Sequence, residues 1–212
     1  GFSLIATTVC LLVGYPLAYA MSKTRERTRG ILMVLLMLPM WISLLIRTYS
    51  LMALLDNGGI VSGFLVKLGF EKLTFIGTEG AVILGMIYDF LPYMVLPIYT
   101  SIIKLDRRYV EAAADLGCNS VKTMFRVILP LTVPGIVSGV TMVFVPSIST
   151  FYISQKLGGG SFDLIGDTIE RQFQNAVTYH TGAAISLVMM ILILISLAVM
   201  NRFTDSQEDI VI

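Results

Sequence analysis

Asp89 is the carboxylate of this sequence best suited to meet a cation, because aromatic side chains flank it inside an apolar run. Tyr88 precedes it and Tyr93 follows it within Ala81–Ile103. An ionisable group in a run long enough to cross a membrane is costly and usually serves a function. A carboxylate suits the ammonium groups of a polyamine, and each aromatic face adds about 0.5–2 kcal/mol of cation–π attraction. These residues predict a path for a multivalent cation.

Arg47 offers a second interpretation of Asp89. It lies in the stretch Leu44–Ser50 of another apolar run. At about 1.5 Å per helical residue, Asp89 lies roughly 13 Å and Arg47 roughly 10 Å from the outer ends of their runs. Those depths permit an ion pair if the two helices touch, and a substrate would then meet neither side chain directly. Alternatively, Arg47 extends to the outer membrane interface. The sequence leaves these roles open.

A polar, helix-forming segment at residues 106–130 separates two apolar runs. Asp106 is a typical helix N-cap, and Gly117 has the backbone freedom to end that helix. A second helix is expected to follow and to lead into the next apolar run. The small alanines beside Glu111 let another protein approach the backbone closely. The segment is predicted to dock a partner or, alternatively, to rest on the membrane as an amphipathic helix.

A second group of carboxylates lies in the segment 149–180. Gly158–Gly160 predict a hinge, and the residues behind them follow a helical pattern with one apolar side. Asp163, Asp167 and Glu170 are expected to meet a cation or a substrate-binding protein, as an external gate. The alternative is an interfacial helix with a solvated, charged face.

The elements that position these residues are expected to be membrane-spanning helices. The chain is 56% hydrophobic and 14% charged, with a mean hydropathy of +0.83, which is more apolar than soluble domains. A spanning helix needs roughly 20 mainly apolar residues. The sequence predicts an all-α, polytopic membrane helical bundle, in one domain over residues 1–212, and the net charge of +1 gives no reason to expect nucleic-acid binding. The five predicted spans are Phe2–Met21, Ile31–Ala53, Ala81–Ile103, Val127–Ile148 and Thr181–Met200.

Basic residues in the short connections predict the orientation of the spans. Ser22–Gly30 and Lys104–Arg108 are rich in Lys and Arg, and Arg202 follows the last span. If five helices alternate, all three lie on one side, which is expected to be cytoplasmic together with the C-terminus. Residues 54–80 and 149–180 then face outward. No basic stretch precedes the first run, as it would in a signal peptide, so we expect five spans of a full six.

The segment 106–130 resembles the EAA loop of ABC importer permeases. Glu111-Ala112-Ala113 are followed after three residues by Gly117, and nine residues later by Val127-Ile128-Leu129-Pro130, with Val127 where the family usually has isoleucine. In that family the loop forms a coupling helix, which sits in a groove of a separate ATPase subunit. The resemblance implies the type I importer permease fold. It also assigns ATPase docking to Glu111, Ala112, Ala113, Asp115 and Gly117.

The resemblance covers most of Gly1 to Arg202. Leu44–Ser50 and Phe151–Phe173 are similar to the first permease subunit of spermidine/putrescine importers. This implies a bacterial inner-membrane subunit that forms a path for polyamines, with a second permease subunit, an ATPase dimer and an external substrate-binding protein as partners. The chain lacks a phosphate loop of the type GxxxxGK[ST]. ATP and Mg²⁺ are therefore expected on the ATPase, with no cofactor, metal or enzymatic activity in this chain.

Two other functions stay open on the sequence. A related permease for iron, phosphonate or another anion would place a basic group inside the bundle, and Arg47 is such a group. An intramembrane aspartyl protease would need two facing aspartates, and Tyr88-Asp89 and Leu164–Asp167 match parts of its motifs. However, Leu164 stands where that motif has glycine, and Asp167 is predicted outside any span.

Overall fold

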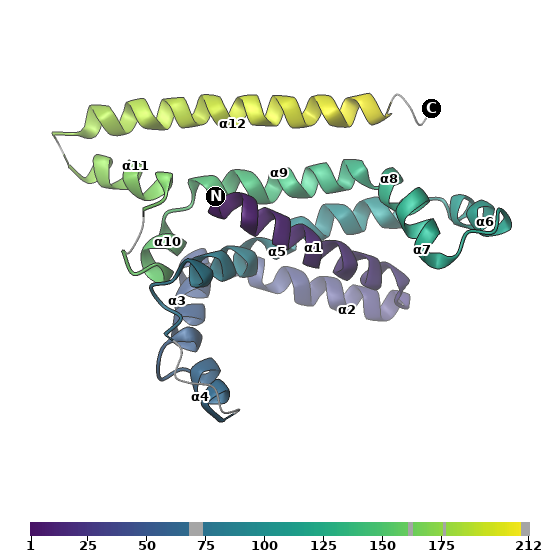
Figure 1. The fold of residues 1–212 in the computed structure, drawn as a ribbon, viewed down its shortest axis with the longest axis horizontal. Helices are drawn as coiled ribbons and strands as arrows, with labels where there is room; N and C mark the ends of the chain where they lie inside the picture. The colour runs from purple at the N-terminus through teal and green to yellow at the C-terminus, as the bar shows by residue number, and fades with distance from the viewer. Residues whose placement is uncertain (68–73, 161–162, 176, 209–212) are drawn as a thin grey trace.

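The computed structural model describes residues 1–67, 74–160, 163–175 and 177–208, and the regular elements in these ranges are all helices (Figure 1). The predicted spans correspond to α1, α2 with α3, α5, α9 and α12, and shorter helices connect them. In chain order the elements are α1 (Phe2–Lys23), α2 (Glu26–Met37), η1 (Leu38–Trp41), α3 (Leu44–Leu55), α4 (Ile60–Lys67), α5 (Glu79–Ile103), α6 (Arg107–Asp115), α7 (Ser120–Thr123), η2 (Met124–Ile128), α8 (Leu129–Leu131), α9 (Val133–Ser149), α10 (Tyr152–Leu157), α11 (Ile165–Gln174) and α12 (Tyr179–Glu208).

The core lies where α5 packs between α1 and α9. Met94 of α5 is fully buried at this crossing. A Cβ atom at Gly14 of α1 would lie 3.1 Å from Met94 Cγ, and one at Gly139 of α9 would lie 2.9 Å from Met94 Sδ. Small residues at such crossings let membrane helices approach closely. The glycines therefore fix how near α1 and α9 come to α5.

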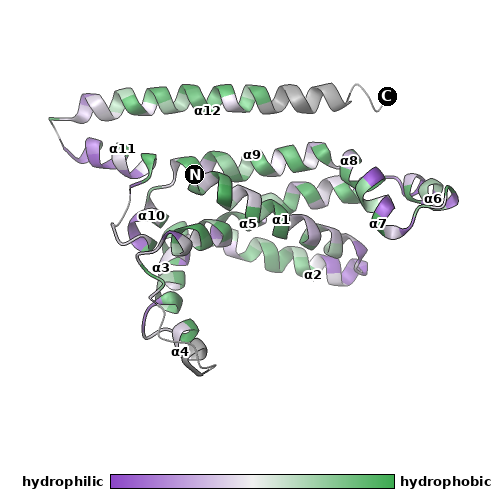
Figure 2. Ribbon diagram, in the orientation of Figure 1, coloured by the Kyte–Doolittle hydropathy of each residue, from purple (hydrophilic) through white to green (hydrophobic). Residues whose placement is uncertain are grey.

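Three of the predicted spans are single helices of sufficient length and apolarity to cross a membrane. They correspond to α1, α5 and the part of α12 over Tyr179–Val199. Figure 2 shows these helices as predominantly hydrophobic along their length. α12 runs beside α9 in Figure 1, with only 11% of its apolar window buried within the chain. Most of the surface of Tyr179–Val199 therefore faces outward from this chain.

The other two predicted spans are bent. The predicted span Ile31–Ala53 is broken at Ile42 and Ser43, and the helices on either side meet at 99°. Pro39 lies in the short 3₁₀-helix before the break, and Ile42 is extended. Residues 120–149 bend by 66° next to Thr132. The structure therefore has up to five spans only if each bent pair counts as one.

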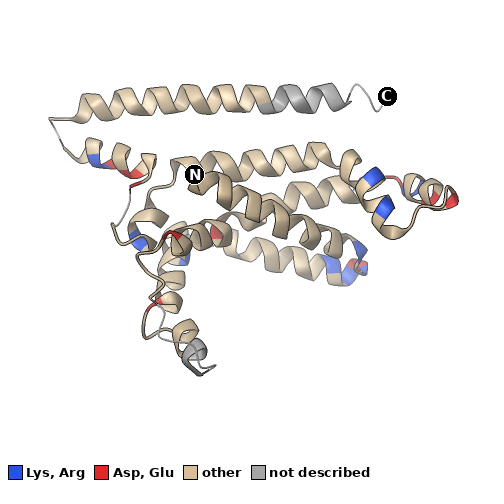
Figure 3. Cartoon of the chain, viewed as in Figure 1, with Lys and Arg blue, Asp and Glu red and all other residues tan. Residues whose placement is uncertain are grey.

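Charged side chains concentrate at the ends of the bundle (Figure 3). Lys and Arg gather where the start of α2 lies near the end that carries α6 and α7. The segments predicted to lie on the opposite side, 54–80 and 149–180, contain the short helices α4, α10 and α11 within their described parts. They are joined by a hydrogen bond from Gly77 N to Leu157 O, 2.7 Å long.

Candidate functional site

Asp89 and Arg47 form an ion pair inside the bundle. Arg47 Nη1 lies 3.2 Å from Asp89 Oδ1 and also donates to the backbone oxygen of Asp89 at 3.2 Å. Thr48, the next residue of α3, donates to Asp89 Oδ2 at 3.4 Å. Arg47 is 6% exposed, and Thr48 and Asp89 are fully buried. α3 therefore supplies two consecutive side chains that neutralise and hold the one carboxylate of α5 at this depth.

This arrangement places Asp89 among protein groups, and it does not gather the two tyrosines around the carboxylate. Tyr88 is exposed, and the Tyr93 ring packs edge-on against Phe90 with 6.5 Å between ring centroids. Asp89 Oδ1 has contact with Arg47 but no hydrogen-bond donor among the described residues. The predicted trio of Asp89, Tyr88 and Tyr93 is therefore not a common cation-binding cavity in this conformation.

Residues 106–130 fold as the helix, turn and second helix that the sequence predicts. The Asp106 carboxylate accepts from Arg108 N at 3.0 Å, and the Asn119 side chain accepts from Lys122 N at 2.8 Å. Between them, Gly117 has φ of +78°, in the left-handed region where glycine ends helices. Cys118 N closes the turn by donating to Ala113 O at 2.9 Å. Local capping thus fixes the direction of α6.

The surface of this segment is apolar and largely uncovered. Leu116 is 85% exposed, Phe125 65% and Val121 63%. Glu111, Ala112 and Asp115 are exposed, whereas Ala113 is buried against the rest of the chain. Glu111 forms no ion pair within the described part of the chain. Exposed apolar side chains of this kind are typical of a surface that a partner covers.

The residues that continue from α6 into the bundle include an irregular turn. Met124–Ile128 form a π-helix, which is rare and often lies at functional sites. Thr132 ends α8 and is fully buried, and its hydroxyl lies 3.0 Å from the hydroxyl of Tyr15 on α1. The 66° bend between residues 120–131 and α9 lies at this point.

The three carboxylates predicted as an external gate have different environments. Asp163 accepts a hydrogen bond from Arg171, which raises the pKa of the Arg171 guanidinium. Glu170 accepts from Gln155 and, at 3.1 Å, from Gln174. Both glutamate partners are neutral amides.

Asp167 corrects the expectation that all three carboxylates lie on a solvated face. It is 4% exposed, and its Oδ2 accepts from Ser154 Oγ at 2.7 Å and from Leu164 N at 2.8 Å. It therefore caps the start of α11 and fastens that helix to α10. The sequence pattern placed Asp167 off the apolar side, but the partner from α10 buries it.

An aromatic cation site on the outer segment was not predicted from the sequence. The Lys156 ammonium lies 5.4 Å from the Tyr49 ring centroid and 5.8 Å from that of Tyr152. The two rings meet edge to face, 6.0 Å apart. Tyr49 follows Thr48 on α3, so this pair lies on the same helix as the Arg47 contact. Tyr152 and Lys156 are four residues apart on α10, but Tyr49 is more than 100 positions earlier, so the sequence did not indicate that the three residues meet.

Comparison with known proteins identifies the family. Residues 11–208 match the family described as the inner membrane component of binding-protein-dependent transport systems. The chain belongs to this family. The permease is 41% identical over 200 residues to the spermidine/putrescine transport system permease protein PotB of Haemophilus influenzae, covering 93% of this chain and 70% of that protein. It is also 41% identical to PotB of Escherichia coli K12, covering 95% and 74%.

A third relative is more distant in sequence. The inner membrane ABC transporter permease protein YdcU of Escherichia coli K12 is 30% identical over 213 residues, covering 93% of the permease and 68% of YdcU. This relative and both PotB proteins are transport permeases by name. The family assignment therefore rests on matches that extend over most of the permease.

Solved structures confirm the fold of the permease. A chain of a bacterial alginate ABC transporter superposes with a TM-score of 0.75 at 19% identity, covering 96% of the permease and 77% of that chain. A chain of the MetNI methionine ABC transporter, in an inward-facing conformation, gives a TM-score of 0.67 at 17% identity, covering 97% and 91%. The all-helical ABC importer permease fold expected from the sequence is therefore confirmed.

Proposed function

We propose that this permease forms part of the translocation path of an ATP-driven importer for polyamines. The observation that carries the substrate class is the 41% identity, over 93% of the chain, to a permease named for spermidine and putrescine. The predicted outer segment adds a compatible feature, because the Lys156 ammonium group lies 5.4 Å and 5.8 Å from the ring centroids of Tyr49 and Tyr152. Substrate ammonium groups have the same chemistry.

The proposed assembly contains a second permease subunit, two ATPase subunits and an external substrate-binding protein. ATP and Mg²⁺ bind the ATPase subunits, and this chain transmits their movement. The coupling helix α6, with Glu111, Ala112, Ala113, Asp115 and Gly117, is the proposed docking surface. Its exposed apolar neighbours support this role, because an isolated chain gains nothing from leaving Leu116 in water.

The proposed orientation places α6 and the C-terminus in the cytoplasm and the segments 54–80 and 149–180 outside. The gathering of Lys and Arg at the end that carries α6 supports it (Figure 3). In this orientation the Tyr49–Tyr152 pair and the carboxylates Asp163 and Glu170 face the binding protein. Asp167 serves the same surface indirectly by holding α11 in place.

The Arg47–Asp89 pair supports a structural role for these two residues. An anion importer would need Arg47 as a free basic group, but Asp89 neutralises it at 3.2 Å. An intramembrane protease would need Asp89 and Asp167 to face each other. Instead, Asp89 contacts α3 and Asp167 contacts α10. These contacts favour the polyamine importer over both alternatives.

Uptake of labelled spermidine tests the substrate class. The permease would be produced with its partner subunits in cells that lack their own polyamine importers. We expect saturable uptake that putrescine inhibits and a phosphonate does not. Inhibition by the phosphonate alone, or no uptake by a complex that assembles and hydrolyses ATP, would refute the polyamine substrate while leaving the permease assignment intact.

Reversing the charge of Glu111 tests the docking surface. We expect Glu111→Lys to lower recovery of the ATPase with the permease by at least about tenfold, because reversal of an interfacial charge costs several kcal/mol. The amount of permease in the membrane should not change. Glu26→Lys makes the same charge change at the start of α2 and is the matched control. Normal recovery of the ATPase with Glu111→Lys would exclude this residue from docking.

A further inference from the structure

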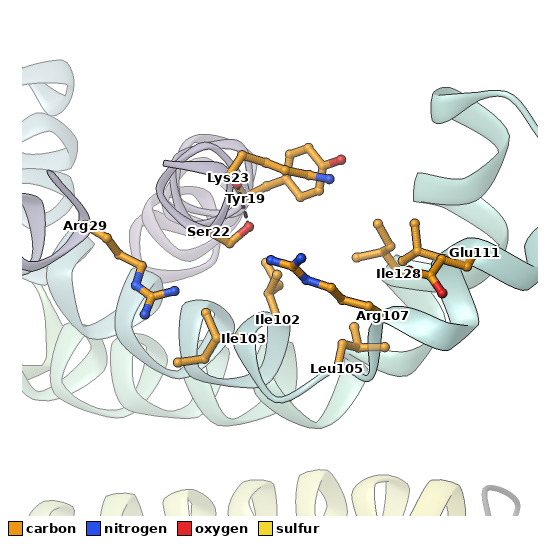
Figure 4. A pocket seen from close by; sticks show the side chains of 11 residues that line it. Tyr19, Ser22, Lys23, Arg29, Ile102, Ile103, Leu105, Arg107, Glu111 and Ile128 are labelled. Carbon is orange, nitrogen blue, oxygen red and sulfur yellow. Dashed lines mark hydrogen bonds between the residues drawn. The ribbon is translucent and has the colours of Figure 1, made fainter. Parts of the chain in front are cut away.

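A pocket of about 380 Å³ lies at the end of the bundle that carries α6 (Figure 4). Its three cationic side chains come from three separate helices. Lys23 is in the last turn of α1, Arg29 lies near the start of α2, and Arg107 begins α6. In Figure 4 the side chains of all three border one space, and the Arg107 guanidinium extends toward Ser22. The fold therefore gathers charges that are up to 84 positions apart in the sequence (107 minus 23).

The positive charge of this pocket exceeds its negative charge among the described residues. Lys23, Arg29 and Arg107 form no ion pair there, and the Lys23 ammonium lies 5.3 Å from the Tyr19 ring centroid. Glu111 is the one acidic side chain among the described residues of the lining. Like charges that share a pocket repel one another, and an anion between them removes that repulsion. A phosphate group could accept hydrogen bonds from both arginines.

The pocket also has apolar lining residues, and one of its helices exposes apolar side chains. Ile102 and Ile128 belong to the lining, and both are buried. Beyond Arg29, α2 has no buried residue and exposes Ile31, Val34 and Leu35. An amphiphile would use both surfaces, with its anionic group at the arginines and its hydrocarbon along α2. Free phosphate would leave the apolar face unused.

We propose that this pocket binds the phosphodiester headgroup of an anionic phospholipid, with its acyl chains along α2. The proposal rests on the proposed orientation, which places the pocket at the cytoplasmic surface of the membrane. Arg107 belongs to α6, whereas Lys23 and Arg29 belong to α1 and α2. A bound headgroup therefore links the coupling helix to the bundle by contacts that the protein alone does not make.

Native mass spectrometry of the assembled transporter tests this site. The complex would be exchanged into nanodiscs of phosphatidylcholine with or without phosphatidylglycerol, released into mild detergent and analysed for retained lipid. We expect retained phosphatidylglycerol on the unmodified permease. The double variant Lys23→Gln/Arg29→Gln should retain about fivefold less for each charge removed. The variant Arg25→Gln/Arg27→Gln removes the same charge from the same connection, outside the pocket lining, and should retain lipid normally.

Each other result would overturn the lipid site. Equal loss in both double variants would show general surface attraction, and no retained phosphatidylglycerol would show that the pocket does not hold lipid. A phosphate adduct in place of lipid, after addition of inorganic phosphate, would show that the ligand is the free anion. Arg29→Lys keeps the charge and should retain most of the lipid. Failure of the ATPase to co-purify with the permease would count against the proposed function. Retention of lipid would still be measured on the permease alone, so the two failures can be distinguished.

Discussion

The buried contact between α3 and α5 and the exposed helix α6 satisfy their polar and apolar groups in opposite ways. At the α3–α5 contact, Asp89 obtains its partners, Arg47 and Thr48, from within the chain. On α6, Glu111 has no ionic partner among the described residues, and the adjoining Leu116 is 85% exposed. The first region is satisfied within one subunit, whereas the second exposes groups that the proposed ATPase contact would cover. Under that proposal, the difference separates residues that stabilise the permease from residues that connect it to the ATPase.

The largest expected effect is on the buried pair. Asp89→Asn leaves the Arg47 charge buried without a counter-charge, which typically costs about 3–5 kcal/mol of folding free energy. We therefore expect much less permease in the membrane and a lower melting temperature in detergent. The amount of permease is measured in membrane fractions, and the melting temperature is measured on the purified variant.

Two controls give this prediction its meaning. The double variant Arg47→Met/Asp89→Leu removes both charges and should be more stable than Asp89→Asn, because no unpaired charge is left. Tyr88→Phe changes the exposed neighbour and should have little effect on stability. If Asp89→Asn accumulates normally but transports less spermidine, Asp89 meets the substrate directly. The α3–α5 contact would then be part of the substrate path and not only a structural contact.

An intermediate effect is expected where α9 crosses α5. A Cβ atom at Gly135 would lie 2.8 Å from the backbone oxygen of Pro97 and 2.5 Å from Ser101 Cβ. Gly135→Ala should therefore destabilise the permease by about 1–3 kcal/mol through overpacking. Thermal unfolding of the permease in detergent measures this loss of stability. Gly30→Ala on α2 meets no atom within 4 Å and should be neutral or stabilising. Equal effects of the two changes would show that the α5–α9 crossing is not close-packed.

This crossing connects the two regions. α5 carries Asp89 in its middle and ends at Ile103, four residues before α6 begins, while α9 begins after the bend at Thr132. α6 is thus connected through a short segment to α5 and through η2 and α8 to α9. Gly135→Ala should impair transport even in the fraction of permease that folds, because the hinge between α8 and α9 lies only three residues away.

The sequence predicted the features that depend on local chemistry. Apolar run length located α1, α5 and α12, and capping chemistry located α6 through Asp106 and Gly117. The break between α2 and α3 was missed because the residues around Ser43 are as apolar as a continuous span would be. Composition over a window does not record a change of direction.

Features that depend on tertiary contacts were predicted less well. The depths of Asp89 and Arg47 permitted their ion pair, but only the packing of α3 on α5 shows that it forms. Asp167 was expected on a solvated face, and the hydroxyl of Ser154, thirteen residues earlier, makes it a buried cap. The pocket at Lys23 and Arg107 was not foreseen, because each cation looked like part of a positively charged loop. Spatial convergence is what turns such charges into a candidate site.

The smallest expected effect on stability is at Leu116. This side chain follows α6, is 85% exposed and makes few contacts within the subunit. Leu116→Ser should therefore change the free energy of unfolding by no more than about 0.5 kcal/mol. The same change should weaken recovery of the ATPase, because burial of a leucine side chain at an interface contributes about 1.5–3 kcal/mol. Melting of the isolated permease and co-purification of the ATPase measure the two quantities separately. A large loss of stability with unchanged recovery would show that Leu116 supports its own subunit, and α6 would then resemble the α3–α5 contact after all.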